Sequence, residues 1–182
     1  MWYNGWMKKT GKIKLVLPSM KYAWAYLRAV KEFDEIGKMT ALGVHLPTRT
    51  IKDLPAYIKR ARENRLGIKL PKGRVPSTLY WAIVGNKVVG RVDIRHKLTK
   101  GLRIIGGHIG YTVVPSERKK GYGTQMLALA LKKVKKMGIK NALVTCDATN
   151  IGSKKIIEKN DGKLINQIKH EDILRLRYNI KL

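Results

Sequence analysis

The stretch VVPSERKKGYGTQMLALALKKVKKMG, residues 113–138, constrains the fold more than any other part of the chain. An apolar run stops at Pro115, and apolar residues at helical spacing begin near Gly121. The turn between them combines basic residues with glycines: Arg118, Lys119, Lys120, Gly121 and Gly123. Because the first N–H groups of a helix are unpaired and the helix dipole adds positive charge, a phosphate binds readily at such a turn. The same residues also fit a purely structural, glycine-rich turn with a solvated basic rim.

The whole sequence predicts a single α/β domain over residues 1–182. Apolar runs predict strands at residues 13–19, 78–85, 87–98, 103–114, 140–146, 162–169 and 172–180. Apolar residues at helical spacing predict helices at residues 20–36, 51–66, 121–137 and 151–160. Gly85 and Asn86 predict a hairpin, and the last two strands are expected to pair antiparallel. This order predicts a mixed, mostly antiparallel central sheet flanked by helices.

The chain is strongly basic, with 39 Lys and Arg against 12 Asp and Glu and a formal charge of +27. Such a field attracts polyanions, so nucleic acids, phosphorylated cofactors and acidic membranes are all compatible partners. The lysines are spread along the chain rather than gathered into a tail, which a generally basic surface also explains. Nucleic-acid binding is therefore compatible with the charge but not favoured.

The sequence favours a cytoplasmic protein without a membrane segment. Cys146 is the single cysteine, which excludes an internal disulfide and fits a reducing compartment. The first 18 residues lack the apolar centre of a signal peptide. No apolar run approaches the ~18 residues expected of a spanning helix. Nothing in the sequence argues against a homodimer.

Two segments resemble the GNAT superfamily of N-acetyltransferases. Residues 118–123, RKKGYG, match the family's Arg/Gln-x-x-Gly-x-Gly/Ala motif, and VVPSERKKGYG resembles its crossover from the fourth strand to the third helix. TCDATNIGSKKIIEKNDGKL, residues 145–164, resembles a later segment in which an asparagine opens a helix. Asn150 matches that asparagine, and Ser153 matches the small residue three positions later. The resemblance covers nearly the whole chain, and GGHIGYTVVPSER with RVDIRHKL is similar to a group of uncharacterised bacterial members.

The resemblance implies the GNAT fold and transfer of an acetyl group from acetyl-CoA directly to an amine. It implies that the fourth and fifth strands diverge and that the pantetheine arm pairs with the fourth. The implied acetyl-CoA contacts are Thr112, Val113 and Val114 along the arm, Arg118, Lys119, Lys120, Gly121, Tyr122, Gly123 and Thr124 at the diphosphate, and Asn150 and Ser153 opposite. The amine would belong to a small molecule or a protein N-terminus. No metal is implied, because the histidines lack ligand spacing with acidic partners.

The resemblance also assigns candidate catalytic residues, with two departures from the family pattern. His108 stands where many members carry a glutamate, and an imidazole could serve as general base at neutral pH. A structural histidine on a strand fits the position equally well, and Asp93 and His96 are weaker candidates for the base. The family's usual acid, a tyrosine, corresponds to Ile157, which has no hydroxyl. Ser153 is the nearest alternative acid on that helix, although a serine is a poor one.

Other residues leave further alternatives open. Cys146 fits a small core residue better than a nucleophile, and Trp24, Tyr26, Trp81 and Tyr111 are expected on buried faces. The resemblance implies that residues 37–50 and 166–174 contribute to acceptor specificity, and Asp93, Glu171 and Asp172 could form an acidic patch. A regulatory module that binds acyl-CoA without catalysis is an alternative function, because the tyrosine is missing. A basic nucleic-acid or ribosome binder is a more distant one.

Overall fold

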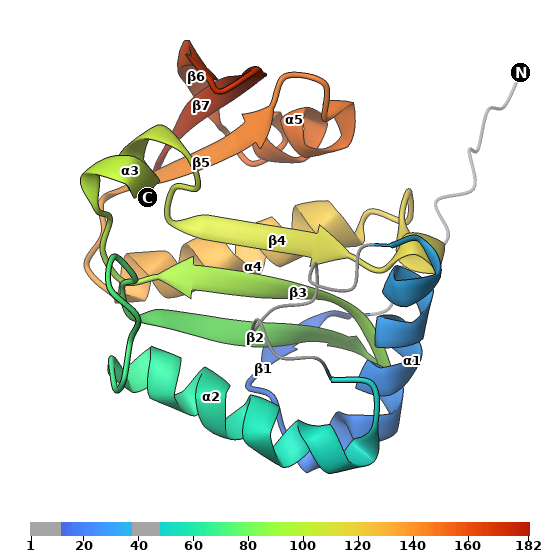
Figure 1. Cartoon of the computed structure of the whole chain (residues 1–182). Coiled ribbons are helices and arrows are strands. Elements are labelled where there is room, and N and C mark those ends of the chain that lie inside the picture. Colours follow the sequence, from blue (N-terminus) through green and yellow to red (C-terminus); the bar gives the residue numbers. More distant parts are fainter. Residues whose placement is uncertain (1–11, 38–47) are drawn as a thin grey trace, which may run out of the picture.

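The structure, a computed structural model of the chain, describes residues 12–37 and 48–182. Its strands form two antiparallel sheets (Figure 1). The first has the order β1-β2-β3-β4, with β1 (Lys14–Val16), β2 (Ser77–Val84), β3 (Lys87–Arg95) and β4 (Ile109–Val113). The second has the order β5-β7-β6, with β5 (Asn141–Asp147), β6 (Lys163–His170) and β7 (Ile173–Lys181). The mixed α/β class is confirmed, and so are the β2–β3 hairpin and the final antiparallel pair.

The helices lie on the faces of these sheets (Figure 1). They are α1 (Ala23–Glu35), α2 (Leu54–Leu66), α3 (Lys100–Ile104), α4 (Tyr122–Lys136) and α5 (Ile151–Glu158), with 3-10 turns η1 (Met20–Tyr22), η3 (Ile51–Asp53) and η4 (Pro115–Glu117). The ends of α2 follow local signals. Thr50 and Asp53 form a capping box before it, and Gly67, at φ +73°, closes it in the left-handed conformation.

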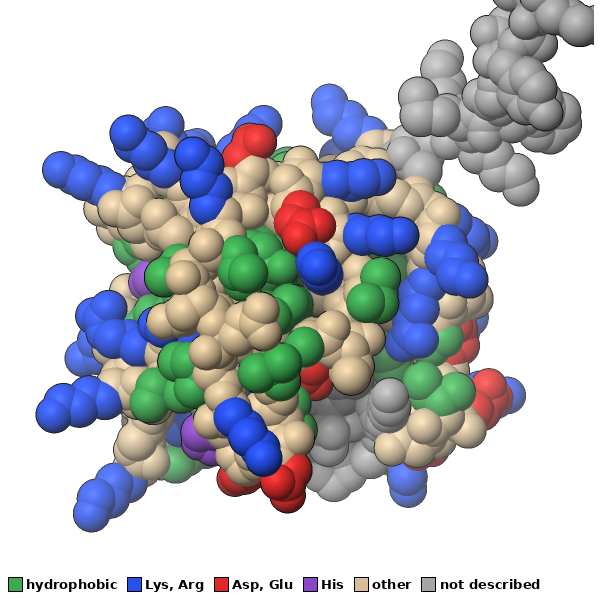
Figure 2. Space-filling view, turned by 90° about the horizontal axis from the view of Figure 1, so that it is seen from above, with side chains coloured by type: hydrophobic (Ala, Val, Ile, Leu, Met, Phe, Trp, Pro, Cys, Tyr) green, Lys and Arg blue, Asp and Glu red, His purple; other side chains and the backbone are tan. Residues whose placement is uncertain are grey.

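Lys and Arg side chains are distributed over the surface. Figure 2 shows them around the outline of one face, with hydrophobic side chains nearer its middle. The exposed apolar side chains of the last two strands are Leu164, Ile165, Ile173 and Leu174. In residues 12–37 and 48–182, no helix has the length and apolar character needed to cross a membrane.

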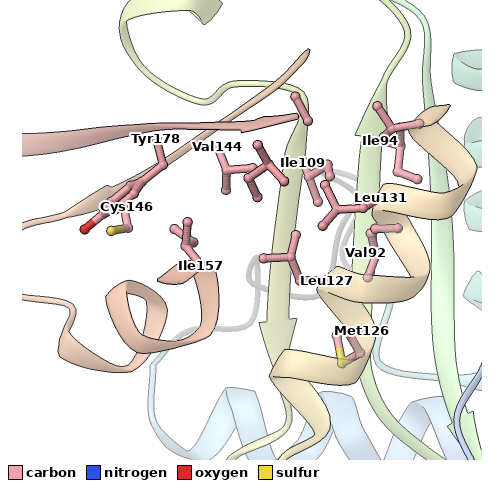
Figure 3. Packing of buried hydrophobic residues seen from close by; sticks show 14 of the residues in the cluster. Val92, Ile94, Ile109, Met126, Leu127, Leu131, Val144, Cys146, Ile157 and Tyr178 are labelled. Atoms are coloured by element: carbon pink, nitrogen blue, oxygen red, sulfur yellow. The ribbon is translucent and has the colours of Figure 1, made fainter. Parts of the chain in front are cut away.

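Two hydrophobic clusters fill the interior. The smaller lies between the first sheet and helices α1 and α2, where the rings of Tyr26 and Trp81 stack with centroids 4.4 Å apart. The larger combines residues of both sheets with residues of α4 and α5 (Figure 3). Because Ile109 of β4 and Val144 of β5 belong to this one cluster, side-chain packing holds the two sheets together.

The two sheets touch where β4 begins. The backbone N–H of His108 donates to the Leu143 carbonyl at 2.7 Å, and an isolated bridge pairs Gly107 with Val144. Gly107 has φ +61°, and a Cβ placed on it would lie 2.3 Å from the Leu143 carbonyl oxygen. Beyond this junction no ladder joins β4 to β5 in the described part of the chain. One edge of β4 therefore has no strand partner, as the resemblance implied.

Two expectations about local structure were wrong. Residues 103–114 were expected to form one strand, but helix α3 ends at Ile104 and β4 begins only at Ile109. The Thr99 hydroxyl caps α3 by accepting from the Leu102 N–H at 3.2 Å, and Gly106, at φ +113°, turns the chain. Trp24 was expected on a buried face, but its exposed fraction is 69%.

Candidate active site

The turn between β4 and α4 presents a row of backbone N–H groups. Among residues 12–37 and 48–182, no acceptor pairs with the N–H groups of residues 119–124, and the first bond into the helix runs from Gln125 N to Gly121 O. Lys119 and Gly121 have φ values of +59° and +79°. Left-handed residues in such a turn direct successive N–H groups into an anion-binding concavity. The arrangement fits the diphosphate site that the sequence predicted.

The two glycines of this turn serve different purposes. A Cβ at Gly121 would meet nothing within 4 Å, so its positive φ explains the glycine. A Cβ at Gly123 would lie 2.5 Å from Ile156 Cδ1 and 3.5 Å from Val113 Cγ2. Gly123 therefore lets the first turn of α4 pack closely on α5 and β4. This packing, rather than an approach to phosphate, is the contact the structure gives it.

A cavity of about 1340 Å³ lies beside the turn, bounded by α1 and the β2–β3 hairpin. Its basic lining residues are Arg28, Lys87, Lys119 and Lys120. Glu117 accepts from Lys120 Nζ at 2.9 Å, and Glu32 of α1 accepts from the Ser116 N–H at 3.0 Å and hydroxyl at 2.9 Å. The Glu32 contacts fix α1 against the turn. The cavity thus keeps more cations than carboxylates next to the N–H row.

Alternate residues of β4 direct their backbone N–H and C=O groups toward its free edge. The Val114 N–H donates to Val89, and the His108 carbonyl accepts from Arg95, so every second residue between them also pairs with β3. The backbone groups of Thr112 and Val114 therefore face β3, and their contact with a pantetheine arm stays a prediction. Tyr111 and Val113 carry the backbone groups that face away from β3. The Val113 carbonyl lies 3.4 Å from Arg118 Nε.

His108 lies at the junction of the sheets. Its Nδ1 accepts a hydrogen bond from the Leu143 N–H at 2.9 Å, so in the neutral ring the proton is on Nε2. Burial, helped by Arg103 and Arg95, lowers the pKa of His108 below its usual value. The ring is therefore neutral at pH 7, but its free lone pair is already used. These contacts favour the structural alternative, and the role of general base stays a prediction.

Asn150, Ser153 and Tyr111 come together beside the free edge of β4. Asn150 Oδ1 caps α5 by accepting from the Ser153 N–H at 3.0 Å, and the amide N–H groups of Asn150 have no partner among the described residues. The Tyr111 hydroxyl lies 3.4 Å from the Ser153 carbonyl and so spans from β4 to α5. Burial raises the pKa of Tyr111 to about 12, which keeps its proton in place. The sequence analysis treated Tyr111 only as a core residue.

Ile157 and Cys146 are core residues. Ile157 has no exposed surface, and Cys146, which is 6% exposed, lies in the same cluster beside Tyr178 (Figure 3). Burial raises the pKa of the Cys146 thiol, which opposes formation of a thiolate nucleophile. The interpretation of Cys146 as a core residue is confirmed. The absence of a hydroxyl at position 157 leaves Tyr111 as the hydroxyl that faces Ser153.

The remaining predicted residues lie apart from this site. His96 Nε2 is 2.8 Å from the Thr78 hydroxyl, and burial lowers its pKa. Asp93 lines a second cavity at the opposite end of β3, whereas Glu171 and Asp172 lie at the exposed turn between β6 and β7. The three carboxylates therefore do not line one cavity. Most of the segment 37–50 expected to select the acceptor lies outside the described residues, and within them no cluster of His, Cys, Asp or Glu could hold a metal.

Comparisons with known proteins agree with this fold. The chain resembles the microcin C7 self-immunity acetyltransferase MccE, solved with acetyl-CoA and AMP, at 15% identity and TM-score 0.67, over 97% of this chain and 98% of that one. It resembles Mycobacterium smegmatis RimJ, solved with CoA-disulfide, at 17% identity and TM-score 0.70, over 94% and 83%. The apo ribosomal L7/L12 acetyltransferase RimL matches at 14% identity and TM-score 0.64, over 97% and 92%.

At these identities the likeness shows a shared fold. No curated protein matches the sequence significantly. The family described as "Acetyltransferase (GNAT) domain" matches residues 18–163, which include β4, the N–H row of the turn and Asn150. The chain therefore belongs to the GNAT acetyltransferase family.

Proposed function

We propose that the protein is an N-acetyltransferase that moves an acetyl group from acetyl-CoA directly to a primary amine of a small molecule or a protein N-terminus. The observation that carries this proposal is the row of unpaired N–H groups at residues 119–124, which lies at the end of the unpaired edge of β4. A diphosphate and an extended amide-containing arm need these two features side by side. Lys119 and Lys120 add charge-assisted donors to the phosphate end.

Acetyl-CoA, when bound, supplies an acetyl group activated as a thioester, which the amine nitrogen attacks as the carbon–sulfur bond breaks. The backbone groups of Tyr111 and the N–H of Val113 face away from β3 and are available to pair with the pantetheine amides, whereas the Val113 carbonyl accepts from Arg118 Nε at 3.4 Å. An N–H on that edge can polarise the thioester carbonyl. Asn150, whose Oδ1 caps α5, has amide N–H groups that could donate to the arm from the other side. These residues position two reactants, which alone supplies a large share of acetyl-transfer catalysis.

The Tyr111 hydroxyl is our candidate for the group that stabilises the departing sulfur. A thiol has an ordinary pKa of ~8.5, so a thiolate can leave near neutral pH without full protonation. A hydrogen-bond donor that keeps its own proton is then sufficient, and a tyrosine with a raised pKa meets that requirement. Ser153 presents its carbonyl to Tyr111, so we propose that it orients this hydroxyl. This reasoning supports turnover in a chain that carries Ile157 at the usual tyrosine position.

The amine must lose a proton during transfer. His108 would accept it only after Nδ1 releases the Leu143 N–H, because both ring nitrogens are otherwise occupied by a proton or a hydrogen bond. We therefore propose His108 first as the residue that positions the junction of β4 and β5. The second possibility is that His108 is the general base. A variant whose side chain accepts from the Leu143 N–H but does not titrate near neutral pH distinguishes the two roles.

The test combines binding with turnover. Acetyl-CoA should raise the melting temperature of the wild-type chain, and Gly121→Glu should abolish the shift because it places a carboxylate at the diphosphate site. Gly138→Glu is the matched control, since Gly138 has φ +80° and open space but lies at the other end of α4. Thiol release across a panel of amines then measures transfer. Equal shifts in the two variants would contradict the placement of the diphosphate.

The buried Ile157 supports a second candidate, a module that binds acyl-CoA without catalysis. In that case acetyl-CoA would still stabilise the chain, and Gly121→Glu would still abolish the effect. No amine in the panel would increase thiol release above the rate without amine. Transfer to any amine at a rate that depends on Tyr111 rules this candidate out.

A further inference from the structure

A second cavity, of about 620 Å³, lies between α2, residues 70–75, β3 and α3. This volume suits a small molecule or the end of a peptide. Among residues 12–37 and 48–182, its ionisable lining consists of four arginines and one carboxylate: Arg60, Arg74, Arg91, Arg95 and Asp93. The lining has a formal excess of three positive charges and shares no residue with the cavity beside the diphosphate turn.

Two of the arginines have defined positions. Arg95 Nη1 donates to the Gly106 carbonyl at 3.0 Å and to the Gly107 carbonyl at 2.9 Å, so the guanidinium is held without losing its charge. Arg60 Nη1 lies 3.5 Å from Glu63, a partner just outside the lining. With Glu63 included, the formal charges of these described residues still sum to an excess of two positive charges.

These cations lie within electrostatic reach of one another. Burial lowers the pKa of Arg95, Asp93 opposes the shift, and Arg91 and Arg74 add to it. Crowded cations with one carboxylate attract a further anion, and guanidinium groups bind carboxylate and phosphate oxygens in bidentate geometry. The lining therefore fits an oxyanion group better than an uncharged or cationic one.

The cavity also adjoins the proposed site of acetyl transfer. In the β3–β4 ladder, Asp93 lies opposite Gly110 and Arg91 lies opposite Thr112. A Cβ at Gly110 would be 4.0 Å from Arg95 Nη2, so no side chain of Gly110 stands between this guanidinium and the β4 backbone. One strand spacing, ~4.8 Å, separates β3 from β4, whose other edge is the unpaired one. A ligand held by the arginines can therefore reach the edge of β4.

We infer that the acceptor is an amine that also carries an oxyanion, and that this oxyanion binds the arginine cavity while the amine nitrogen lies at β4. The inference rests on the proposed acetyl transfer. In such an acceptor, the amine nitrogen should lie ~5–10 Å from the anionic group, which is one to two strand spacings. Peptides with an acidic residue next to the N-terminus and aminoalkyl phosphates both have this chemistry. Polyamines lack it.

Paired acceptors test the inference. The C-terminal amide of glycyl-aspartate is compared with the C-terminal amide of glycyl-asparagine, so that the side-chain carboxylate is the anionic group that differs. In the second pair, 3-aminopropyl phosphate is compared with 3-aminopropanol. The readout in both is thiol release from acetyl-CoA. The charged member of at least one pair should have the higher kcat/KM. The pair with the larger ratio distinguishes a carboxylate acceptor from a phosphate acceptor.

Variants locate the effect. Arg74→Gln should raise the KM for the preferred charged acceptor about tenfold or more, because a charge-assisted hydrogen bond is lost. It should leave the KM for acetyl-CoA and for the uncharged analogue unchanged. Arg62→Gln is the matched control, since Arg62 is an exposed residue of α2 that does not line the cavity. Arg60→Gln repeats the test on a second element in case Arg74→Gln perturbs the segment around it.

Calorimetric binding of the same acceptors to the free chain separates this inference from the proposed function. Binding of a charged acceptor that weakens in Arg74→Gln and Arg60→Gln supports the cavity even if no acetyl transfer occurs. Transfer that proceeds equally well with charged and uncharged partners would overturn the inference and leave the acetyltransferase intact. Equal KM values in the wild-type, Arg74→Gln and Arg60→Gln chains would overturn it as well.

Discussion

Gly107→Ala should destabilise the junction of the two sheets far more than an ordinary glycine substitution. Gly107 is the residue at which the chain leading into β4 meets β5, and it bridges to Val144. Two independent costs act there. The φ of +61° is left-handed, and an added Cβ would lie 2.3 Å from the Leu143 carbonyl oxygen and 2.9 Å from its carbon.

The two costs can be estimated separately. A left-handed non-glycine residue costs about 1–2 kcal/mol. Ordinary contacts with a Cβ begin at 3.4 Å, so the methyl overlaps the Leu143 backbone by about 1 Å, and a backbone cannot rotate away as a side chain can. Forced overpacking of this kind costs about 1–3 kcal/mol. Together they predict a loss of about 2–5 kcal/mol, a large part of a typical domain's stability.

Gly138→Ala provides the matched control. Gly138 has a similar φ, +80°, but nothing lies within 4 Å of its Cβ position, so only the first cost applies. Urea unfolding of both variants should give free energies that differ by about 1–3 kcal/mol. Acetyl-CoA affinity should also fall only in Gly107→Ala, because β4 must move relative to β5. Equal losses of stability in the two variants would refute the close contact on which this reasoning depends.

Substitutions at three positions address the proton transfers. His108→Asn, whose Oδ1 can accept from the Leu143 N–H, should keep the wild-type melting temperature at pH 8, whereas His108→Ala should cost about 1–3 kcal/mol by leaving that N–H unpaired; an inactive but fully stable Asn variant would instead support the role of base. The folded-state pKa of His108 is lowered, so near that pKa the unfolded chain binds more protons than the folded chain. The stability of the wild-type chain should therefore fall as the pH drops below about 6.5. Unfolding measured across that range should show a shallower fall in stability for the His108→Asn variant. Tyr111→Phe should raise the pKa of the thiol of bound CoA, followed by the ultraviolet absorbance of the thiolate; an unchanged thiol pKa would show that the hydroxyl does not reach the sulfur. Ile157→Tyr should lower stability by about 1–3 kcal/mol without raising kcat, because the Ile157 side chain is fully buried. It packs so closely on Gly162 that a Cβ on that glycine would lie 2.4 Å from Ile157 Cγ2. A variant that is both stable and faster would contradict this packing.

Local signals predicted most of the fold. Gly67 ends α2 as a left-handed cap, and Gly85 with Asn86 forms the β2–β3 turn, because each conformation is decided by a few neighbouring residues. The start of β4 was missed for the opposite reason. The apolar Ile104 and Ile105 favour a strand, but the Thr99 cap and the contact of Gly107 with β5 override that preference, and only the second sheet supplies the contact.

The candidate site divides in the same way. The motif around Gly121 predicted the turn and the start of α4, since both are local features, while anion binding there stays a prediction. Which residues of β4 face the free edge depends on the register with β3, so Thr112 and Val114 could not be separated from Val113 beforehand. The close packing of Gly123 on Ile156 of α5 depends on the tertiary structure, so the sequence motif could not predict it. The cavity arginines come from three separate segments, α2, residues 70–75 and β3, and only the fold brings them together.

The formal charge of +27 must be weighed locally to separate an oxyanion-binding enzyme from a nucleic-acid binder. At physiological salt the Debye length is ~8 Å, so cations spread over the surface contribute little to one bound anionic group. A nucleic acid that neutralised ~6–10 charges would lose affinity by a factor of ~10³–10⁵ between 50 and 200 mM salt. A single oxyanion held by a group of arginines of which three, Arg60, Arg91 and Arg95, are half-buried is screened less. The KM of the preferred acceptor should therefore change by less than about tenfold over that range, and a steep salt dependence would favour the nucleic-acid alternative.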